Sequence, residues 1–174
     1  LMLPDFFQAS EVPIVHKFYR NYFKDCYVCG DVDYIFGPNT AFFDHCEIHS
    51  IARVSEGKAY ITAASTPAGQ EFGLVFSHCR ITGEEPDSVY LGRPWRDCAK
   101  TAFICCELGD HICPEGWQNW GKVRAEVLSD YIEYGNFGPG ADCSGRSPLS
   151  RCLVNPEVET YFSKENVLVG EDGW

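Results

Sequence analysis

Hydrophobic and polar positions along the first two thirds of the chain follow a short motif that occurs four times. Each copy has a phenylalanine, two further residues, a cysteine, one more residue and then an aliphatic residue. Short aromatic and aliphatic stretches with interleaved polar residues are typical of β-strands. The copies begin at Phe23, Phe43, Phe76 and Phe103. Because their separations are unequal, the pattern predicts a solenoid whose coils are joined by loops of different length.

The cysteine of each copy is expected to lie inside the solenoid. Equivalent positions of a parallel solenoid stack about 4.8 Å apart, so Cys26, Cys46, Cys79 and Cys106 should form a buried ladder of small apolar side chains. The same spacing leaves a disulfide between coils open. Structural zinc and a redox-active pair are weaker interpretations, because the chain has a single Cys-x-x-Cys, ending at Cys29, in a strand-like segment.

The chain beyond the repeat has a different character. Residues 113–154 are rich in glycine and proline and are predicted to form long loops with short strands. Asn155-Pro156 followed by EVETYF predicts a short helix, with the asparagine as its cap and the proline at its first position. An ordinary β-sandwich is the alternative fold, and the repeat favours the solenoid.

Composition and charge narrow the possible functions. The 174 residues include 45% hydrophobic residues, which is enough to form the core of one domain. Acidic residues outnumber basic ones by 25 to 14, which gives a formal net charge of −11. Such a chain repels phosphate backbones, so no nucleic-acid partner is expected. No apolar run approaches the ~20 residues of a membrane-spanning helix, so no membrane partner is expected either.

An aspartate within an apolar segment is the first candidate for chemistry. In VDYIFG (32–37), strict strand alternation places Tyr34 and Phe36 on one face and Asp33 and Ile35 on the other. A carboxylate among such residues is costly unless a cation or several hydrogen-bond donors hold it. A turn-capping role is the plain alternative, and it suits the neighbouring Asp31 better than Asp33.

The second candidate is an arginine in YLGRPWR (90–96). Pro94 forces Arg93 toward an extended backbone, and an aromatic residue follows. A guanidinium fixed in this way is suited to binding a carboxylate with two hydrogen bonds. We therefore predict that Arg93 lies against the carboxylate of Asp33.

Both segments resemble motifs of a known family. VDYIFG is similar to the VDFIFG motif of the pectin methylesterases, and YLGRPWR to their LGRPW signature. HICPEGWQNWGK (111–122), YIEYGNFGPGADCSGR (131–146) and the closing NVLVGEDGW resemble further segments of that family. The resemblance runs in order from about residue 17 to residue 174.

The resemblance implies an all-β fold, a right-handed parallel β-helix. The helix would be incomplete at its N-terminus, with a loop-rich C-terminal region and a short C-terminal helix. Residues 1–174 would then form a single, partial domain that lacks the upstream coils of the family.

Functional roles also follow from the resemblance. The family removes methyl esters from polygalacturonate with two aspartates. Asp33 matches the nucleophile, which would form an acyl-enzyme with the ester carbonyl, and Arg93 matches the residue that orients it. Asp5, in LPDFF, is the nearest candidate for the general acid and base. No cofactor or metal is implied. The matched substrate-binding aromatic residues are Phe36, Trp95 and Trp117.

One departure from the family bears on activity. The Gln-Asp-Thr motif that supplies the acid and an oxyanion donor is absent, since Pro4 and Phe6 flank Asp5. Losing such a donor typically costs ~10²–10³ in rate. The alternative function is therefore a catalytically impaired β-helix that only binds pectin. A polysaccharide lyase or hydrolase on the same architecture is disfavoured, because neither carries LGRPW.

The expected partner is methyl-esterified homogalacturonan, bound by a monomer. Free pectate would be repelled by so acidic a protein, whereas esterified pectin carries much less charge. Because pectin is extracellular, the resemblance implies secretion or the cell surface. The many cysteines and the lack of a visible signal sequence leave a cytoplasmic location open.

Overall fold

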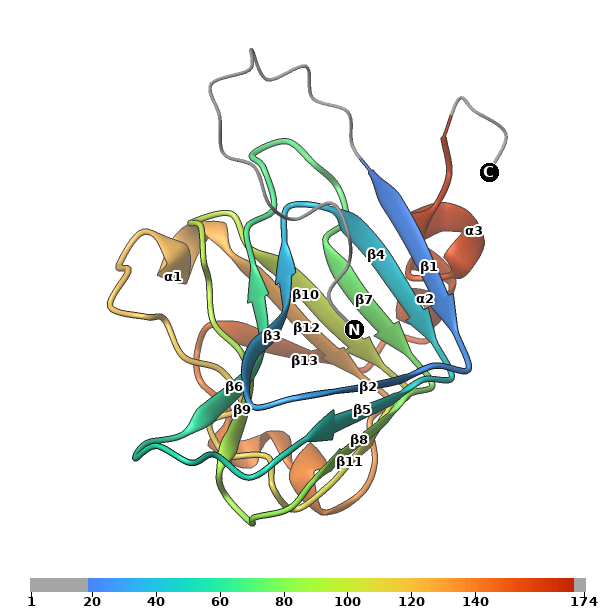
Figure 1. Ribbon diagram of the computed structural model, residues 1–174. Coiled ribbons are helices and arrows are strands. Elements are labelled where there is room, and N and C mark those ends of the chain that lie inside the picture. The colour runs from blue at the N-terminus through green and yellow to red at the C-terminus, as the bar shows by residue number, and fades with distance from the viewer. Residues whose placement is uncertain (1–18, 171–174) are drawn as a thin grey trace.

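The computed structural model of the chain describes residues 19–170, and parallel strands in three sheets dominate it (Figure 1). The chain passes through one strand of each sheet in turn and then returns to the first sheet one coil further along. The six-stranded sheet has the order β1 (Arg20–Lys24), β4 (Thr40–Asp44), β7 (Leu74–Ser77), β10 (Lys100–Ile104), β12 (Asp130–Tyr134) and β13 (Ser150–Leu153). The four-stranded sheet has the order β11 (Glu107–Leu108), β8 (Arg80–Gly83), β5 (Glu47–Ser50) and β2 (Tyr27–Gly30). The three-stranded sheet consists of β3 (Val32–Gly37), β6 (Ala59–Ala64) and β9 (Val89–Gly92).

The register of the strands confirms the repeat found in the sequence. Phe23 pairs with Phe43, Phe43 with Phe76, and Phe76 with Phe103, all between parallel strands. The aliphatic position that ends each copy is aligned in the same way, from β2 through β5 and β8 to β11. The fold is therefore a parallel β-helix, as predicted.

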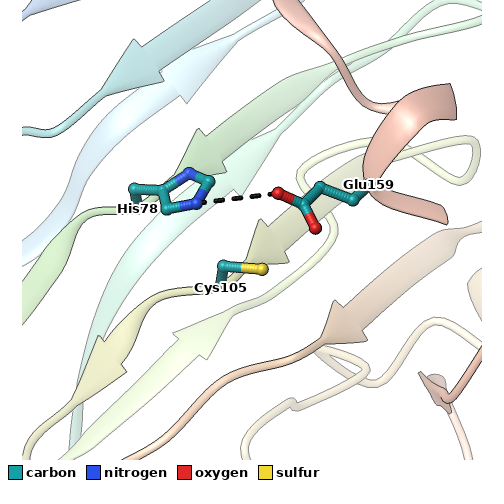
Figure 2. Close-up of side chains that lie close together, drawn as sticks. All are labelled: His78, Cys105 and Glu159. Carbon is teal, nitrogen blue, oxygen red and sulfur yellow. Dashed lines mark ion pairs between the residues drawn. The ribbon is translucent and has the colours of Figure 1, made fainter. Parts of the chain in front are cut away.

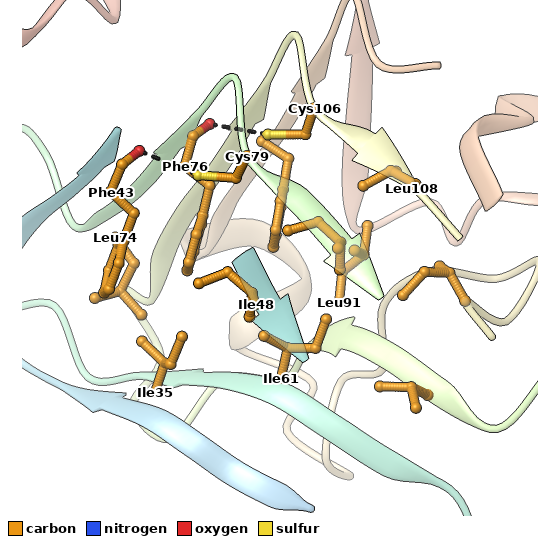
Figure 3. Close-up of a cluster of buried hydrophobic side chains, with 14 of the residues drawn as sticks. Ile35, Phe43, Ile48, Ile61, Leu74, Phe76, Cys79, Leu91, Cys106 and Leu108 are labelled. Carbon is orange, nitrogen blue, oxygen red and sulfur yellow. Dashed lines mark hydrogen bonds between the residues drawn. The ribbon is translucent and has the colours of Figure 1, made fainter. Parts of the chain in front are cut away.

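The aligned phenylalanine rings form a stack through the core (Figure 3). Successive centroids lie 4.7, 4.6 and 4.5 Å apart, with interplanar angles of 12° or less. Figure 3 shows Phe43 and Phe76 side by side, with aliphatic residues of the other two sheets facing them. The stack ties the coils together because each inner ring packs on two others.

The expected cysteine ladder is present, with one correction. Cys46, Cys79 and Cys106 are buried, and each thiol donates a hydrogen bond to the carbonyl oxygen of the phenylalanine one coil earlier, at 3.4–3.5 Å. Cys26 is only partly buried, so the prediction that all four are buried was wrong for this residue. Among the described residues it belongs to the first coil, and only the second coil packs against it.

The disulfide lies elsewhere in the chain. All four ladder cysteines are free thiols, so the inter-coil disulfide that the spacing allowed does not form. Instead Cys143 is bonded to Cys152, which joins the loop region to β13.

A substitution in the phenylalanine stack tests its contribution to stability. Phe76→Leu should lower the free energy of unfolding by about 1–3 kcal/mol, because two ring–ring contacts are lost and each is worth about 0.5–1.5 kcal/mol. Phe23→Leu, at the end of the described stack, removes only the contact with Phe43 and should cost about half as much. Urea unfolding measures both, and equal costs would contradict the stacking account.

Short helices cover the outer face of the six-stranded sheet. The helix predicted after Asn155-Pro156 is α2 (Glu157–Tyr161), and α3 (Lys164–Val167) follows it (Figure 1). The Asn155 side chain accepts a hydrogen bond from the Glu157 amide at 3.0 Å, in keeping with its predicted capping role. A second apolar cluster lies between the helices and the sheet: Phe42, Phe72, Val75, Ile132, Phe162 and Val167 belong to it.

The loop-rich region between residues 113 and 154 was also predicted correctly. It holds the short helix α1 (Ala125–Leu128), two 3-10 turns (Pro139–Ala141 and Cys143–Gly145) and the last two strands of the six-stranded sheet. Within residues 19–170, no helix is long and apolar enough to cross a membrane.

A buried ion pair replaces the phenylalanine stack in the fifth coil. Glu133 occupies the position next to Phe103 in the sheet and is 2% exposed. The Arg146 guanidinium binds both of its carboxylate oxygens, at 2.9 and 3.0 Å, and also donates to the carbonyl oxygen of Gly140. Trp117 donates a further hydrogen bond to Glu133 at 2.9 Å. The carboxylate is therefore fully satisfied inside the core.

His111 is a buried residue that makes stability depend on pH. Its side chain is 1% exposed, it lies against Gly83 and Gly109, and neither ring nitrogen has a hydrogen-bond partner among the described residues. Burial lowers its pKa to about 4. The folded state therefore favours the neutral ring, whose contribution to stability is present above about pH 6.5 and is lost as the pH falls toward 4.

Replacing His111 by leucine should flatten the pH dependence of stability between about pH 6.5 and pH 4. Protonation of carboxylates destabilises the parent and His111→Leu alike as the pH falls. The readout is therefore the difference between the urea midpoints of the two proteins at each pH. A difference that stays constant across this range would show that His111 does not resist protonation.

Candidate active site

Asp33 lies on an irregularity of β3. The pairing of β3 with β6 shifts by one residue between Val32 and Ile35, which is a β-bulge. Asp33 has a φ of +50°, a conformation that few residues other than glycine adopt. The strict alternation expected for VDYIFG was therefore wrong: Tyr34 and Ile35 both pack against the core, while Asp33 points to Arg93. Bulges often redirect a side chain in this way next to functional sites.

Arg93 binds the carboxylate of Asp33 as predicted. It directly follows β9, and its Nε and Nη2 atoms donate to Oδ1 and Oδ2 of Asp33 at 2.9 and 2.5 Å. The two side chains are 16% and 24% exposed, so the pair is sheltered and still reachable from solvent. The Arg93 amide also donates to the carbonyl oxygen of Thr62 on β6, which fixes the start of the loop. A two-pronged contact of this kind fixes the orientation of a carboxylate.

Two aromatic rings hold the guanidinium of Arg93 from either side. Its central carbon lies 3.9 Å from the ring centre of Tyr60 and 3.8 Å from that of Trp120. Arginine stacks well on aromatic faces, so these rings fix its plane. Sequence reasoning missed both residues. Trp120 could have been found, because it is the second tryptophan of the GWQNW segment that the resemblance already included.

Lys122 fastens the loop that carries Arg93. Its ammonium group donates to the carbonyl oxygens of Pro94 and Trp95, at 2.6 and 2.9 Å, and lies 4.4 Å from the ring centre of Trp120. Burial lowers the pKa of Lys122, and the positive charge of Arg96 adds to this shift. Lys122 therefore holds the backbone of this loop in place, and with it the positions of Arg93, Trp95 and Trp120.

An aromatic surface lies beside the Asp33–Arg93 pair. Phe36, on the same strand as Asp33, contacts Trp95 edge to face with centroids 5.6 Å apart. Trp95 is 38% exposed and Phe36 is half-buried. Exposed aromatic faces next to a polar site are suited to stacking on the apolar faces of sugar rings.

Trp117 is not part of that surface, which corrects the sequence prediction. It is 2% exposed and stacks on Tyr131 at 4.2 Å, and its indole N–H binds Glu133. It pairs with Gly92, immediately before Arg93, where an added Cβ would lie 3.1 Å from the indole ring. Because the ring fills the core beneath the loop, Trp117 supports the site from inside and has no free face for a ligand.

The other predicted catalytic residue, Asp5, lies outside the described residues. Its predicted role as general acid and base is therefore a sequence-based hypothesis. His45 and His78 are exposed and do not lie at this site.

Fold and site together define a class of protein. The parallel β-helix presents an aspartate–arginine pair beside an exposed aromatic surface, formed by β3 and the loop that follows β9. The family model described as "Pectinesterase" matches residues 10–171, and the chain belongs to this family.

Individual relatives agree with this assignment. Pectinesterase 31 of Arabidopsis thaliana is 40% identical over 141 residues, which cover 80% of this chain and 43% of that protein. Pectinesterase 2 of Olea europaea is 36% identical over 145 residues, covering 83% and 38%. The pectin methylesterase from carrot superposes with a TM-score of 0.78 at 30% identity, covering 86% of this chain and 50% of its own. The chain thus spans about two fifths to one half of the length of these relatives.

Proposed function

We propose that the protein hydrolyses the methyl esters of pectin, which yields methanol and free galacturonate carboxylates. The observation that carries the proposal is the two-pronged Asp33–Arg93 contact beside an exposed aromatic surface. Membership of the pectinesterase family supports the reaction class. A related pectin methylesterase, with a TM-score of 0.69 and 27% identity, was solved in complex with a hexasaccharide, which supports an oligosaccharide as ligand of this surface.

In the proposed reaction Asp33 is the nucleophile. One carboxylate oxygen attacks the ester carbonyl carbon, the bond from that carbon to the methoxy oxygen breaks, and an acyl-enzyme anhydride remains. The departing methoxide takes a proton from a general acid. Water then attacks the anhydride and regenerates the carboxylate. Asp33 is 24% exposed, so its oxygens can reach a substrate while Arg93 holds them.

Arg93 orients the nucleophile through its two hydrogen bonds to the carboxylate. The guanidinium cannot give up its proton and stays charged at any working pH. Its plane is fixed by Tyr60 and Trp120, so the carboxylate is held in one orientation before substrate arrives. We assign the acid and base role to Asp5 on the sequence resemblance alone.

The charge of the protein favours an esterified substrate. With a net charge of −11, the chain repels a polyanion such as pectate. A methylated uronate is uncharged, and Phe36 and Trp95 offer it an apolar surface. Hydrolysis gives the product negative charges, and the acidic protein repels them, which favours release of the product.

The location that we propose is outside the cell, secreted or at its surface. The disulfide between Cys143 and Cys152 supports this, because disulfides persist mainly in oxidising compartments. The cell-wall polysaccharide proposed as substrate lies in the same place.

The proposed activity can be tested with highly methylated pectin and the 174-residue chain. Methanol and new carboxylate groups should appear in equal amounts, without unsaturated products and without new reducing ends. Unsaturated products would identify a lyase, and new reducing ends a glycoside hydrolase. Binding of pectin by a folded chain without methanol release would favour the binding-only alternative.

Replacing Arg93 by lysine tests its proposed role. Lysine keeps a positive charge but loses the two-pronged contact and the stacking between rings. We expect methanol release to fall about tenfold to a hundredfold, since a charged hydrogen bond is worth about 1.5–3 kcal/mol. Arg124→Lys is the control, because Arg124 is 80% exposed and pairs only with Asp97 among the described residues. Equal rates in both variants would remove Arg93 from the mechanism.

A further inference from the structure

One corner of the β-helix carries a column of outward-facing side chains far from Asp33. Directly after each of the strands β1, β4, β7, β10 and β12 of the six-stranded sheet stands one residue with a φ between +51° and +62°. Because this backbone conformation recurs in every coil, the side chains at these positions line up along the helix. The column consists of the side chains of Asp25, His45, His78 and Cys105, and Gly135 is the equivalent residue of the fifth coil.

Three potential metal ligands meet in this column (Figure 2). His78 follows β7, Cys105 follows β10 on the next coil, and Glu159 reaches them from α2. One ligand atom of each lies within 4.8 Å of the others, and Nε2 of His78 is 3.7 Å from Oε1 of Glu159. Figure 2 shows the imidazole edge, the thiol and the carboxylate directed at the same small space.

The histidine ring is oriented for coordination through Nε2. Its other nitrogen, Nδ1, lies 2.9 Å from the hydroxyl oxygen of Ser77. Ser77 can accept a hydrogen bond from Nδ1, and in that tautomer Nε2 presents its lone pair toward Glu159 and is free to bind a metal ion. A hydrogen-bond partner on the far ring nitrogen is the usual way in which a ligating histidine is fixed.

We propose that His78, Cys105 and Glu159 form a binding site for a zinc ion. One nitrogen, one thiolate and one carboxylate are ligand types that Zn²⁺ accepts, and a water molecule completes the tetrahedron. A neutral imidazole and two anionic ligands balance the two positive charges. Binding displaces the proton of the thiol into solvent.

The dimensions of the cluster suit this ion. Ligand bonds of about 2.0–2.3 Å require ligand atoms roughly 3.3–3.8 Å apart in a tetrahedron. The 3.7 Å between Nε2 of His78 and Oε1 of Glu159 meets this requirement, and all three ligand atoms lie within 4.8 Å of one another. The side chains of these two residues are 41% and 51% exposed, so they can move slightly and leave room for water.

The proposed ion would fasten α2 to the β-helix. Two of its ligands belong to successive coils and the third to the helix, which otherwise packs on the sheet through apolar contacts such as Val158. The site is distinct from the Asp33–Arg93 pair, whose aspartate lies on β3 of the three-stranded sheet and whose arginine follows β9. The proposal therefore does not depend on the esterase activity.

Another acid and cysteine cluster does not compete for the ion. Glu133, Cys143 and Cys152 also lie close together, but both sulfur atoms are in the disulfide and the carboxylate is bound by Arg146. The other free cysteines are the main source of nonspecific metal binding. The experiment must therefore distinguish binding by these cysteines from binding by Cys105.

Titration of the 174-residue chain with Co²⁺, a spectroscopic substitute for Zn²⁺, tests the site. The titration is done in oxygen-free buffer. We expect one equivalent to bind and to give a thiolate-to-cobalt absorption band, which Zn²⁺ then removes by displacement. Cys105→Ser should abolish the band. Glu159→Gln should raise the dissociation constant for Co²⁺ by about a hundredfold or more. Replacing a residue that only supports a metal ligand already weakens binding about tenfold to a hundredfold.

Matched controls make the result decisive. Cys29→Ser removes an exposed free thiol outside the cluster, and Glu157→Gln changes another carboxylate of α2; both should bind Co²⁺ like the parent. Circular dichroism confirms folding of each variant. Absence of the band in the folded parent would overturn the proposal. An unchanged band in Cys105→Ser would also overturn it, because binding would then be adventitious coordination by other thiols.

A stability measurement gives an independent readout. Zn²⁺ at a hundredfold excess over its dissociation constant should raise the ratio of folded to unfolded protein about a hundredfold, because a ligand of the folded state shifts unfolding by mass action. The increase should vanish in Cys105→Ser and persist in Cys29→Ser. An equal increase in the two variants would contradict a site at His78, Cys105 and Glu159.

Discussion

Replacing Asp33 by asparagine is expected to abolish methanol release from methylated pectin, with a fall of at least about 10⁴-fold, the scale found when a covalent nucleophile is removed. The amide has nearly the same shape, so the bulge in β3 should persist. It cannot form the anhydride, however, and its NH₂ group faces the Arg93 guanidinium, where an acceptor is needed. The variant should therefore fold and still bind pectin.

Asp31→Asn is the matched control for this prediction. Asp31 is two residues away, and its carboxylate accepts a hydrogen bond from the Val32 amide at 2.8 Å without contacting Arg93. Its methanol release should stay close to that of the parent. Activity of Asp33→Asn within about tenfold of the parent would exclude Asp33 as the nucleophile, because a lost nucleophile cannot cost so little.

Replacing Glu133 by glutamine should lower the free energy of unfolding by about 3–5 kcal/mol, the cost of leaving one partner of a buried ion pair uncompensated. Arg146 is 4% exposed, and within residues 19–170 its guanidinium forms an ion pair with Glu133 alone. Glutamine also turns one acceptor of the site into a donor that faces the arginine. Urea unfolding gives this quantity directly.

An exposed pair between β12 and β13 provides the comparison. Arg151 contacts Asp130 at 2.6 Å, and the two side chains are 62% and 38% exposed. Arg151→Met should cost less than about 1 kcal/mol, because solvent screens such pairs. If Glu133→Gln lowered the free energy of unfolding no more than Arg151→Met does, the buried pair would have no special role in stabilising the core.

The repeating part of the fold could be predicted from the sequence because each coil uses the same residues for the same contacts. Phe43 and Phe76 occupy equivalent positions in consecutive coils, and the parallel register aligns them. The helix after Asn155-Pro156 follows from local capping chemistry in the same way. Both predictions rest on short-range rules that neighbouring coils reinforce.

The irregular features could not be predicted in this way. Alternation failed at Asp33 because a bulge changes which residue faces the core, and a bulge has no periodic signature. Tyr60 and Trp120 contact Arg93 from segments on two different coils, so their convergence depends on the fold. Trp117 was placed at the surface from a motif match, which does not distinguish a tryptophan that contacts substrate from one that supports the loop from the core.

The change in the fifth coil did leave a signal in the sequence. Glu133 and Asn136 stand where the earlier copies have phenylalanine and cysteine. A carboxylate at a core position requires a buried cation, which predicts a partner for Glu133. The identity of that partner could not be predicted, because Arg146 reaches it through the loop that contains two 3-10 turns.

The most direct test of the central claim is exchange of labelled methanol into pectin. The chain is incubated with methylated pectin in water that contains deuterated methanol, and the methyl groups of the recovered pectin are analysed by mass spectrometry. If an acyl-enzyme forms on Asp33, methanol can return by the reverse of the step in which it left. We expect deuterated methyl esters with the parent chain and none with Asp33→Asn. Hydrolysis without any exchange would contradict the covalent aspartyl mechanism.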